Sequence, residues 1–474
     1  MARKAAASEV DVRVLAEVVA HPDPESRAQT GREMRRKVPR SAHAEWDGTL
    51  PRKAPADILS EQEVTRVADL IPIRHERMGA SAFAFYRGAA AVMASDLSLV
   101  PRTDLLVQCC GDAHLANFGG FASPERDLVF DINDFDETSV GPFEWDVKRL
   151  TASFEIACRA REFSEKETRA IVLANVRAYR EAVREFATMR NLDVWYARIN
   201  AAEIRDRLGG QTTGAGRKRF DALVAKAETK DSMKAFSKLT TMVDGEPRII
   251  NDPPLIVPLE DLAGENAAGA AQAKEFLHLY FREYRHSLQG DRRRLIEGYR
   301  LVDIARKVVG VGSVGTRCWI ALLLGRDNDD PLFLQFKEAT ASVLEPYCGK
   351  SGYASSAQRV VEGQRLLQAS SDILLGWVRL EHGILDGLEH DYYARQLWDW
   401  KVSVDLETIP PGNMLAYAQL TGWSLARGHA RSGDRIAIAA YLGSGDVFDR
   451  AISDFAIAYA DQNERDYETV TKAR

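Results

Sequence analysis

Apolar positions in the first half of the chain predict two short strands and then long helices. Leu105–Val107 and Leu128–Phe130 are short apolar runs bounded by polar turns, which is typical of buried strands. The capping-box pattern Ser164–Glu167 predicts the start of a helix. The apolar residues after it recur at helical spacing: Val172, Val176, Tyr179, Val183 and Phe186. A second helical stripe is Phe276, Leu279, Tyr280, Tyr284 and Leu288. Residues 145–300 are therefore predicted to be mostly helical, with an exposed loop at 211–216.

From about residue 306 the pattern changes from helices to strands. Three apolar runs predict strands: Lys307–Val309, Trp319–Leu324 and Leu332–Phe336. A second capping-box pattern, Ser355–Gln358, predicts a helix that continues to about Ala369. Two further strands are predicted at 373–380 and 392–405, before a mainly helical tail.

Composition narrows the class of protein. The 474 residues include 63 basic and 69 acidic side chains, and the net charge of −6 excludes a globally basic nucleic-acid binder. An apolar content of 45% and a charged content of 28% are ordinary for a globular protein. The five cysteines are scattered without a C-x-x-C pair, so neither a zinc site nor a disulfide framework is indicated. Without an apolar leader or a membrane-length apolar run, we expect a soluble cytoplasmic protein.

The N-terminal 60 residues contain a short basic run: Arg32, Arg35, Arg36, Lys37 and Arg40. The sequence His-Pro-Asp-Pro at 21–24 breaks regular structure just before it. We expect residues 1–60 to be a loosely ordered arm, solvated or in contact with phosphate or an acidic partner.

A group of polar residues follows each of the two predicted N-terminal strands. Asp112 and Asn117 follow the first, and Asp134 and Asp136 follow the second. Phosphoryl transfer from a nucleotide needs a carboxylate that accepts the acceptor's proton, and an amide and a carboxylate that hold Mg²⁺. The D-x-x-x-x-N spacing is also that of the kinase catalytic loop. Turn-capping residues with a solvated acidic loop, or a two-metal hydrolase that uses His114 beside the acids, are the alternatives.

A glycine-rich stretch, Gly310–Gly315, precedes the second group of strands. A dinucleotide site would need a helix after this G-x-G-x-x-G pattern, whereas a strand is predicted here. A glycine loop between two strands, followed by a third strand that ends in lysine, is the arrangement of kinase ATP sites. Lys337 is that lysine, and it points away from the strand face formed by Leu332, Leu334 and Phe336. Glu362, on the predicted helix that follows, is its candidate partner.

Two motifs carry a resemblance to known kinases. Gly111–Phe118 reads Gly-Asp-Ala-His-Leu-Ala-Asn-Phe and resembles the catalytic loop of aminoglycoside-phosphotransferase-like kinases, whose pattern is H-G-D-x-H-x-x-N. Gly141–Asp146 is similar to the segment after their metal-binding acid, where an Asp opens a helix and braces the catalytic loop.

A wider resemblance extends over about residues 30–460. From Arg74–Met78 and Phe83–Gly88 through Leu334–Ala339, the chain resembles the bacterial domain-of-unknown-function family 2252. The kinase resemblance implies Asp112 as the catalytic base. It implies the following Mg²⁺ ligands: Asn117, Asp134 and Asp136, the last as a second ligand or as the true one.

The same resemblance implies an ATP site. Lys337 would contact the α- and β-phosphates and pair with Glu362. The loop over the phosphates would be formed by Gly310, Gly312, Ser313 and Gly315. Arg87 has no counterpart in the pattern, and a buried structural arginine paired to an acid is the simpler interpretation of it.

The chain departs from the kinase pattern in two ways. Cys110 stands where the pattern has histidine, and the glycine loop and lysine follow the catalytic loop instead of preceding it. We therefore expect an α+β fold that is protein-kinase-like, bilobal and circularly permuted. Its parts would be an arm at 1–60, a helix-rich lobe at 61–304, a strand-rich nucleotide lobe at 305–405 and a helical segment at 406–474.

The function expected from these residues is ATP- and Mg²⁺-dependent transfer of phosphate, or of AMP, to an unknown hydroxyl acceptor. That acceptor is a small molecule, a lipid or a protein, and neither a membrane nor a specific nucleic acid is expected as a partner. The alternatives are an inactive nucleotide-binding pseudokinase and a metal-dependent phosphohydrolase. In the kinase interpretation Asp112, Asn117, Asp134 and Lys337 line one cleft between the lobes. Lys337 then lies within about 4 Å of Glu362 or of the two aspartates.

Overall fold

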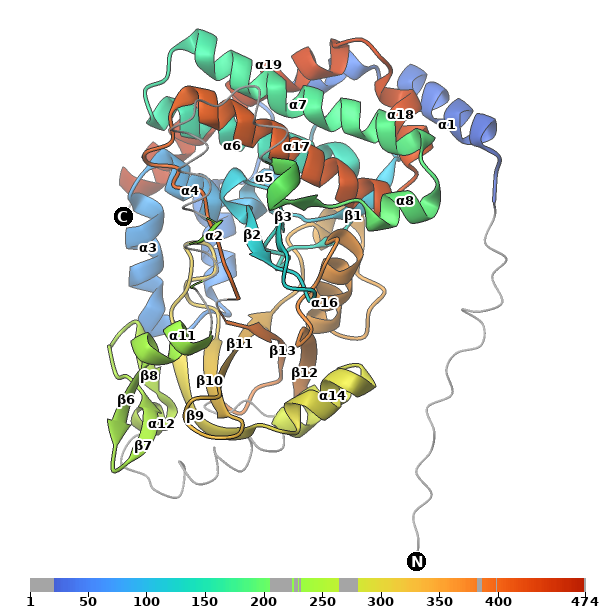
Figure 1. Cartoon of the computed structure of the whole chain (residues 1–474). Coiled ribbons are helices and arrows are strands. Elements are labelled where there is room, and N and C mark those ends of the chain that lie inside the picture. The colour runs from blue at the N-terminus through green and yellow to red at the C-terminus, as the bar shows by residue number, and fades with distance from the viewer. Residues whose placement is uncertain are drawn as a thin grey trace, which may run out of the picture.

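The computed structural model describes residues 21–204, 224–225, 229, 232–263, 280–381, 386–397 and 399–472. It is a mixed α+β structure, as the sequence predicted, with antiparallel sheets and many helices. The longest helices gather at one end of the molecule, and a six-stranded sheet lies at the other (Figure 1). The predicted loop at 211–216 and two residues of the second helical stripe, Phe276 and Leu279, lie outside the described residues.

The helical end is built around aromatic side chains. Its main helices are α6 (Phe143–Ala160), α7 (Glu165–Thr188), α17 (Pro411–Ser432), α18 (Arg435–Leu442) and α19 (Val447–Lys472). The predicted capping box is present at the start of α7, where Ser164 and Glu167 exchange hydrogen bonds. The Phe143 ring stacks on Tyr179 at 6.2 Å between centroids, and both rings are buried. The predicted apolar stripe of α7 thus forms part of the core.

The described residues before β1 (Leu106–Cys109) fold into a series of short helices. They are α1 (Pro24–Lys37), η1 (Arg40–Ala44), α2 (Pro55–Glu63), η2 (Ala68–Leu70), α3 (Ile71–Gly79), α4 (Ala82–Gly88) and α5 (Ala90–Leu97). The expectation of a loosely ordered arm over residues 1–60 is wrong from Pro24 onward, because α1 packs on α18. Arg35 Nε donates to the Tyr441 carbonyl at 2.8 Å, and Arg40 donates to the Leu442 carbonyl. Two residues of the basic run, Arg35 and Arg40, therefore cap the C-terminus of α18, where cations are favourable.

The large sheet is antiparallel throughout, in the order β12-β13-β11-β10-β9-β8. Its strands are β8 (Ile256–Pro258), β9 (Arg300–Lys307), β10 (Cys318–Leu324), β11 (Pro331–Ala339), β12 (Gly376–Leu380) and β13 (His390–Gln396). Both faces of β10 and β11 are buried, which explains their nearly continuous apolar runs. In β11, Leu332 and Leu334 pack in one apolar cluster and Phe333 in another, as the predicted alternation requires.

Three small sheets complete the strands. They are β1 (Leu106–Cys109) with β4 (Ser139–Pro142), β2 (Phe118–Ala122) with β3 (Leu128–Ile132) and β5 (Ile199–Asn200), and β6 (Thr240–Val243) with β7 (Glu246–Ile249). The prediction that residues 145–300 are mostly helical is thus wrong for β5 to β8, because strands of two to four residues are too short to show a period. The predicted strand at 392–405 ends at Gln396.

The structure describes seven further helices. They are η3 (Leu115–Asn117), α8 (Asn191–Tyr196), α11 (Ser232–Leu239), α12 (Leu259–Ala263), α14 (Gly290–Ile296), α15 (Glu345–Cys348) and α16 (Ser356–Leu367). The second predicted helix start is present, since Ser355 caps α16 by accepting from the Gln358 amide. Among the described residues, no helix combines the length and apolar character needed to cross a membrane.

Candidate functional site

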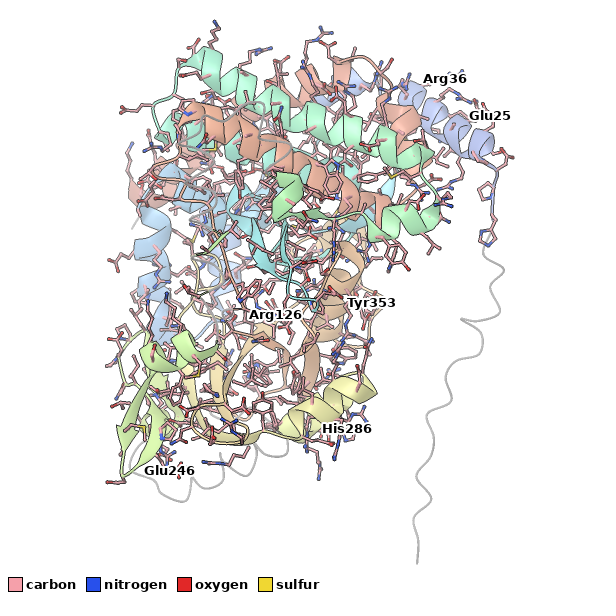
Figure 2. The ribbon with its side chains drawn as sticks, in the orientation of Figure 1. Glu25, Arg36, Arg126, Glu246, His286 and Tyr353 are labelled. Atoms are coloured by element: carbon pink, nitrogen blue, oxygen red, sulfur yellow. The ribbon has the colours of Figure 1, made fainter. Side chains whose placement is uncertain are left out.

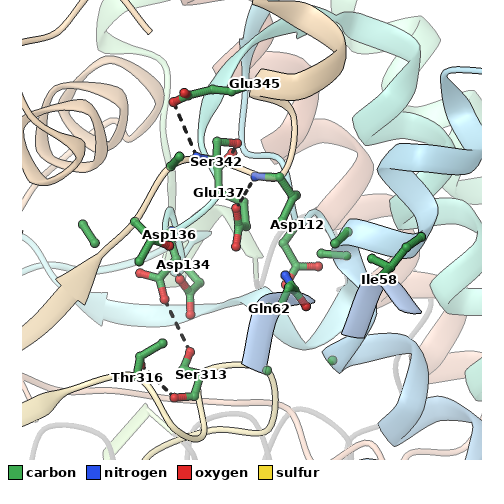
Figure 3. Close-up of a pocket in the computed structure, with 18 of the residues that line it drawn as sticks. Ile58, Gln62, Asp112, Asp134, Asp136, Glu137, Ser313, Thr316, Ser342 and Glu345 are labelled. Carbon is green, nitrogen blue, oxygen red and sulfur yellow. Dashed lines mark hydrogen bonds between the residues drawn. The ribbon is translucent and has the colours of Figure 1, made fainter. Parts of the chain in front are cut away.

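A polar cavity of about 740 Å³ lies between the six-stranded sheet and the helical end. Its walls come from separate parts of the chain: α2, the end of α4, the loops after β1 and β3, the loop between β9 and β10, and the segment after β11. Figure 3 shows Asp112 on one side and Asp134, Asp136 and Ser313 on the other. The cavity therefore gathers both groups of polar residues that the sequence singled out.

The loop that carries Asp112 is held by its backbone. Gly111 has φ +83°, and a Cβ there would lie 2.1 Å from the Glu137 carbonyl oxygen, so only glycine fits. Asp146, near the start of α6, accepts from the Cys110 amide at 2.6 Å and the Gly111 amide at 3.0 Å. His429 of α17 lies 3.2 Å from the same carboxylate. Asp146 thus braces the loop, as the resemblance of Gly141–Asp146 to the kinase segment implied.

The two carboxylate oxygens of Asp112 have different surroundings. Arg149, buried in α6, donates to Oδ1 from Nε at 2.8 Å and from Nη2 at 2.6 Å. On the other oxygen, Oδ2, His114 Nε2 lies 3.7 Å away. Asn117 Nδ2 donates to the Asp112 carbonyl at 2.8 Å. Because Arg149 occupies Oδ1, Oδ2 is the oxygen left for a ligand in the cavity.

His114 is buried beside Asp112 and is only 3% exposed. Burial lowers the pKa of its imidazole to about 4, although Asp112 opposes the shift. The ring is therefore neutral at physiological pH, and its Nδ1 has no hydrogen-bond partner among the described residues. A neutral ring suits a role in fixing the loop.

Asp134 and Asp136 share one lysine. Lys337 Nζ lies 2.6 Å from Asp136 Oδ2 and 3.7 Å from Asp134 Oδ2, and its side chain is 3% exposed. Tyr393 of β13 donates to the other oxygen of Asp136 at 2.5 Å. Burial by itself would raise the pKa of Asp134, but Lys337 and Arg395 outweigh it and lower that pKa to about 2. Both carboxylates thus carry charge that the protein compensates.

Lys337 stays charged in this setting. Burial opposes its charge, but Asp134 and Asp136 raise the pKa of the ammonium well above its usual value. The prediction that Lys337 lines the cavity is wrong, because its nearly inaccessible side chain lies behind Asp134 and Asp136, which do line it. The predicted distance of about 4 Å between Lys337 and these two aspartates is confirmed.

The glycine loop, residues 308–317, joins β9 to β10. Gly310, Gly312 and Ser313 line the cavity, and the Ser313 hydroxyl donates to Asp136 Oδ2 at 3.4 Å. Gly315, with φ +91°, does not line it; a Cβ there would lie 3.1 Å from the Arg66 side chain. Of the four residues assigned to this loop, three therefore face the acids and Gly315 shapes the turn.

Glu362 is not the partner of Lys337. Its carboxylate pairs with Arg365, one turn later on α16, at 2.9 Å. The residue of α16 that reaches the acidic loop is Arg359, which donates to the Asp136 carbonyl at 2.9 Å and the Thr340 carbonyl at 2.7 Å. The assignment failed because a strand-to-helix spacing does not determine which helix face meets the loop.

Other residues of the site escaped the sequence analysis. Arg149 and Tyr393 lie within the largely apolar patterns of α6 and β13, so the sequence analysis did not single them out. A charged residue on the buried face of a helix is unusual, and Arg149 could have been found by that criterion. Glu137 lines the cavity and accepts from the Val343 amide at 2.8 Å, and burial raises its pKa to about 7.

The donor set in the cavity suits Mg²⁺. Asn117 uses its Nδ2 on the backbone, which leaves its amide oxygen, and Asp134 and Asp136 contribute charged carboxylates. Oxygen donors of this kind are what Mg²⁺ prefers, usually one or two carboxylates with phosphate oxygens completing the shell. Within the described ranges, no three His, Cys, Asp or Glu side chains form a metal-binding cluster by themselves. A metal here would thus need further ligands, such as phosphate.

The fold and cavity define a mixed α+β protein with a glycine loop facing lysine-compensated carboxylates. The chain belongs to the family described as "uncharacterized protein conserved in bacteria" (DUF2252), which matches residues 66–473. No curated protein and no solved structure matches the chain.

Proposed function

We propose that the protein is an ATP- and Mg²⁺-dependent phosphotransferase with a circularly permuted kinase-like fold. The observation that carries this proposal is the Lys337–Asp136 ion pair of 2.6 Å, in which Asp136 belongs to the wall of the cavity that Asp112 and Asn117 also line. Enzymes that transfer phosphoryl groups use a lysine on a strand beneath a glycine loop, an acid that binds the metal and a catalytic loop.

The topology of the sheet supports the kinase-like interpretation. Strand, glycine loop, strand and lysine-bearing strand follow one another as β9, residues 308–317, β10 and β11, and these strands are adjacent in the sheet. After the short helix α15, helix α16 packs on β11, β12 and β13. The loops with Asp112 and Asp134 precede all of these elements in the chain, so the lobes follow one another in the reverse of the kinase order.

In this proposal each polar residue has a defined role. Asp112 Oδ2 accepts the proton of the acceptor hydroxyl while the oxygen of that hydroxyl bonds to the γ-phosphorus. The bond between the γ-phosphorus and the β,γ-bridging oxygen breaks, and ADP leaves with the electron pair of that bond. Asn117, Asp134 and Asp136 would hold Mg²⁺, which neutralises charge on the phosphate oxygens. Lys337 is paired with both acids in this structure and would turn to the phosphates when the nucleotide binds, and the glycine loop would cover them.

Calorimetric titration with Mg·ATP tests the proposal directly. The wild-type protein should bind Mg·ATP, Lys337→Ala should weaken binding at least tenfold, and Lys37→Ala, an exposed lysine of α1, should leave it unchanged. No binding at millimolar Mg·ATP would contradict the proposal.

Two aspartate variants separate catalysis from binding. Asp112→Asn should keep nucleotide affinity and lose transfer by roughly 10²–10⁴-fold, because a base contributes only in the transition state. Asp134→Asn should weaken metal-dependent binding as well. A pseudokinase would bind nucleotide without wild-type turnover, and a phosphohydrolase would release phosphate from simple esters without ATP.

A further inference from the structure

Arg87, at the end of α4, lines the cavity with a cation that has no partner. Its guanidinium makes no hydrogen bond or ion pair with the described residues, and its Nε is buried. Three fully buried arginines do have direct partners: Arg149 pairs with Asp112, Arg359 donates to loop carbonyls and Arg427 pairs with Asp131. Arg359 Nε and Arg427 Nη1 nevertheless lack a hydrogen bond among the described residues. Arg87 is half-buried and lacks a direct ion pair, so its position in the cavity wall indicates that an anionic ligand pairs with it.

The position of Arg87 limits where that anion lies. A Cβ on Gly312 would be 3.2 Å from the Arg87 carbonyl oxygen, so the end of α4 packs directly on the glycine loop. Asp112 and Asp134 line the same cavity as Arg87. Burial lowers the pKa of Arg87, and the negative charges of these two aspartates act in the opposite direction and raise it. Arg87 therefore lies between the glycine loop, the proposed base and the proposed metal ligand. In a phosphotransferase, the transferred phosphoryl group occupies this place.

We infer that Arg87 binds the terminal phosphoryl group of a nucleoside triphosphate and stabilises its charge during transfer. This inference rests on the proposed function. It adds a contact from the N-terminal helices, outside the glycine loop and the two acidic loops. A guanidinium supplies several donors in a rigid fork that matches phosphate oxygens, and an arginine aimed at the transferred group increases phosphoryl-transfer rates strongly in other enzymes.

The competing explanation is a structural arginine. Such a residue loses packing or hydrogen bonds when it is removed, and its loss affects all ligands alike. A phosphate-binding arginine without a partner in the empty protein behaves in the opposite way. Its replacement by the uncharged Met should leave the empty protein as stable or more stable, and should affect only ligands that carry the terminal phosphate.

The experiment compares Mg·ADP with the non-hydrolysable triphosphate Mg·AMPPNP by calorimetry, for the wild type, Arg87→Met, Arg87→Lys and Arg36→Met. Arg36 lies exposed on α1, far from the cavity, and is the matched control (Figure 2). We expect Arg87→Met to lose at least tenfold in affinity for AMPPNP and less than twofold for ADP. Arg87→Lys should recover part of the loss, and Arg36→Met should match the wild type. Thermal unfolding without ligand should show no decrease in Tm for Arg87→Met.

Equal losses for both nucleotides, or no loss for either, overturn the assignment of Arg87 while the proposed function stands. If the wild type binds neither nucleotide, the proposed function fails and the assignment fails with it. If Arg87→Met does not fold, Arg87→Lys decides: it keeps the charge, and a selective loss for AMPPNP supports the assignment, whereas unchanged affinity for both nucleotides overturns it.

Discussion

Lys337 Nζ lies 2.6 Å from Asp136 Oδ2, although 201 positions separate the two residues in the chain. The pair ties β11 of the large sheet to the loop after β3 on the helical side. Tyr393, Ser313 and Asp134 extend the contact to β13, the glycine loop and the rest of the acidic loop. This small network therefore joins the two ends of the molecule at the cavity.

Removal of Lys337 should destabilise the protein. Lys337→Met leaves Asp134 and Asp136 close together without their cation. Because these carboxylates are 32% and 26% exposed, the cost is about 1–3 kcal/mol, less than for a fully buried pair. Urea denaturation should show this decrease, and the double variant Lys337→Met/Asp136→Asn should recover part of it. Lys37→Met is the matched exposed control. Stability equal to that of the wild type would show that the pair is unimportant for folding.

Glu362 should be dispensable for nucleotide binding. Its carboxylate pairs with Arg365 on the same helix, so Glu362→Gln removes a half-exposed pair worth well under 1 kcal/mol. Titration with Mg·ATP should show affinity within twofold of the wild type. Asp136→Asn, which breaks the contact with Lys337, should weaken binding at least tenfold. A larger loss for Glu362→Gln than for Asp136→Asn would restore the original assignment of Glu362.

His114 should make the protein sensitive to acid. The unfolded imidazole binds its proton near pH 6.5 and the folded one only near pH 4, so the unfolded state holds more protons in between. The stability contributed by neutral His114 is present above pH 6.5 and is lost as the pH falls towards 4. One pKa unit corresponds to about 1.4 kcal/mol, so the loss is about 3 kcal/mol at most.

His114→Gln should flatten the pH dependence of unfolding free energy between pH 6.5 and 4. A residual slope is expected, because burial also lowers the pKa of His43 well below its usual value. The exposed His286→Gln serves as the control and should keep the wild-type slope. An unchanged slope for His114→Gln would contradict the prediction.

The close contact between α1 and α18 gives a test of the N-terminal segment. A Cβ on Gly31 would lie 2.0 Å from the Ala437 carbonyl oxygen, so Gly31→Ala forces the helices apart at a cost of about 1–3 kcal/mol. Gly412→Ala, in α17, meets no atom within 4 Å and should be neutral or slightly stabilising. Thermal unfolding of both variants checks this. Equal Tm values would indicate that α1 is not docked.

The sequence by itself determined the elements whose signals are local. The capping residues Ser164 and Ser355, the apolar stripe of α7 and the alternation in β11 all depend on neighbours a few positions away, and the structure contains each of them. The acidic motifs and the glycine loop were found in the same way, because their residue types and spacing are visible in the chain.

Only the tertiary structure decided which of these residues meet. Lys337 pairs with Asp136 and not with Glu362. Of the basic run, Arg35 and Arg40 cap α18. Arg87, interpreted from the sequence as a buried structural arginine paired to an acid, is half-buried and forms no such pair among the described residues. Such pairings depend on how helix faces and loops that are hundreds of positions apart in the chain pack together. A buried charge is not solvated by water, so its stability depends on which charged or polar groups lie next to it. No periodicity in the chain encodes that choice.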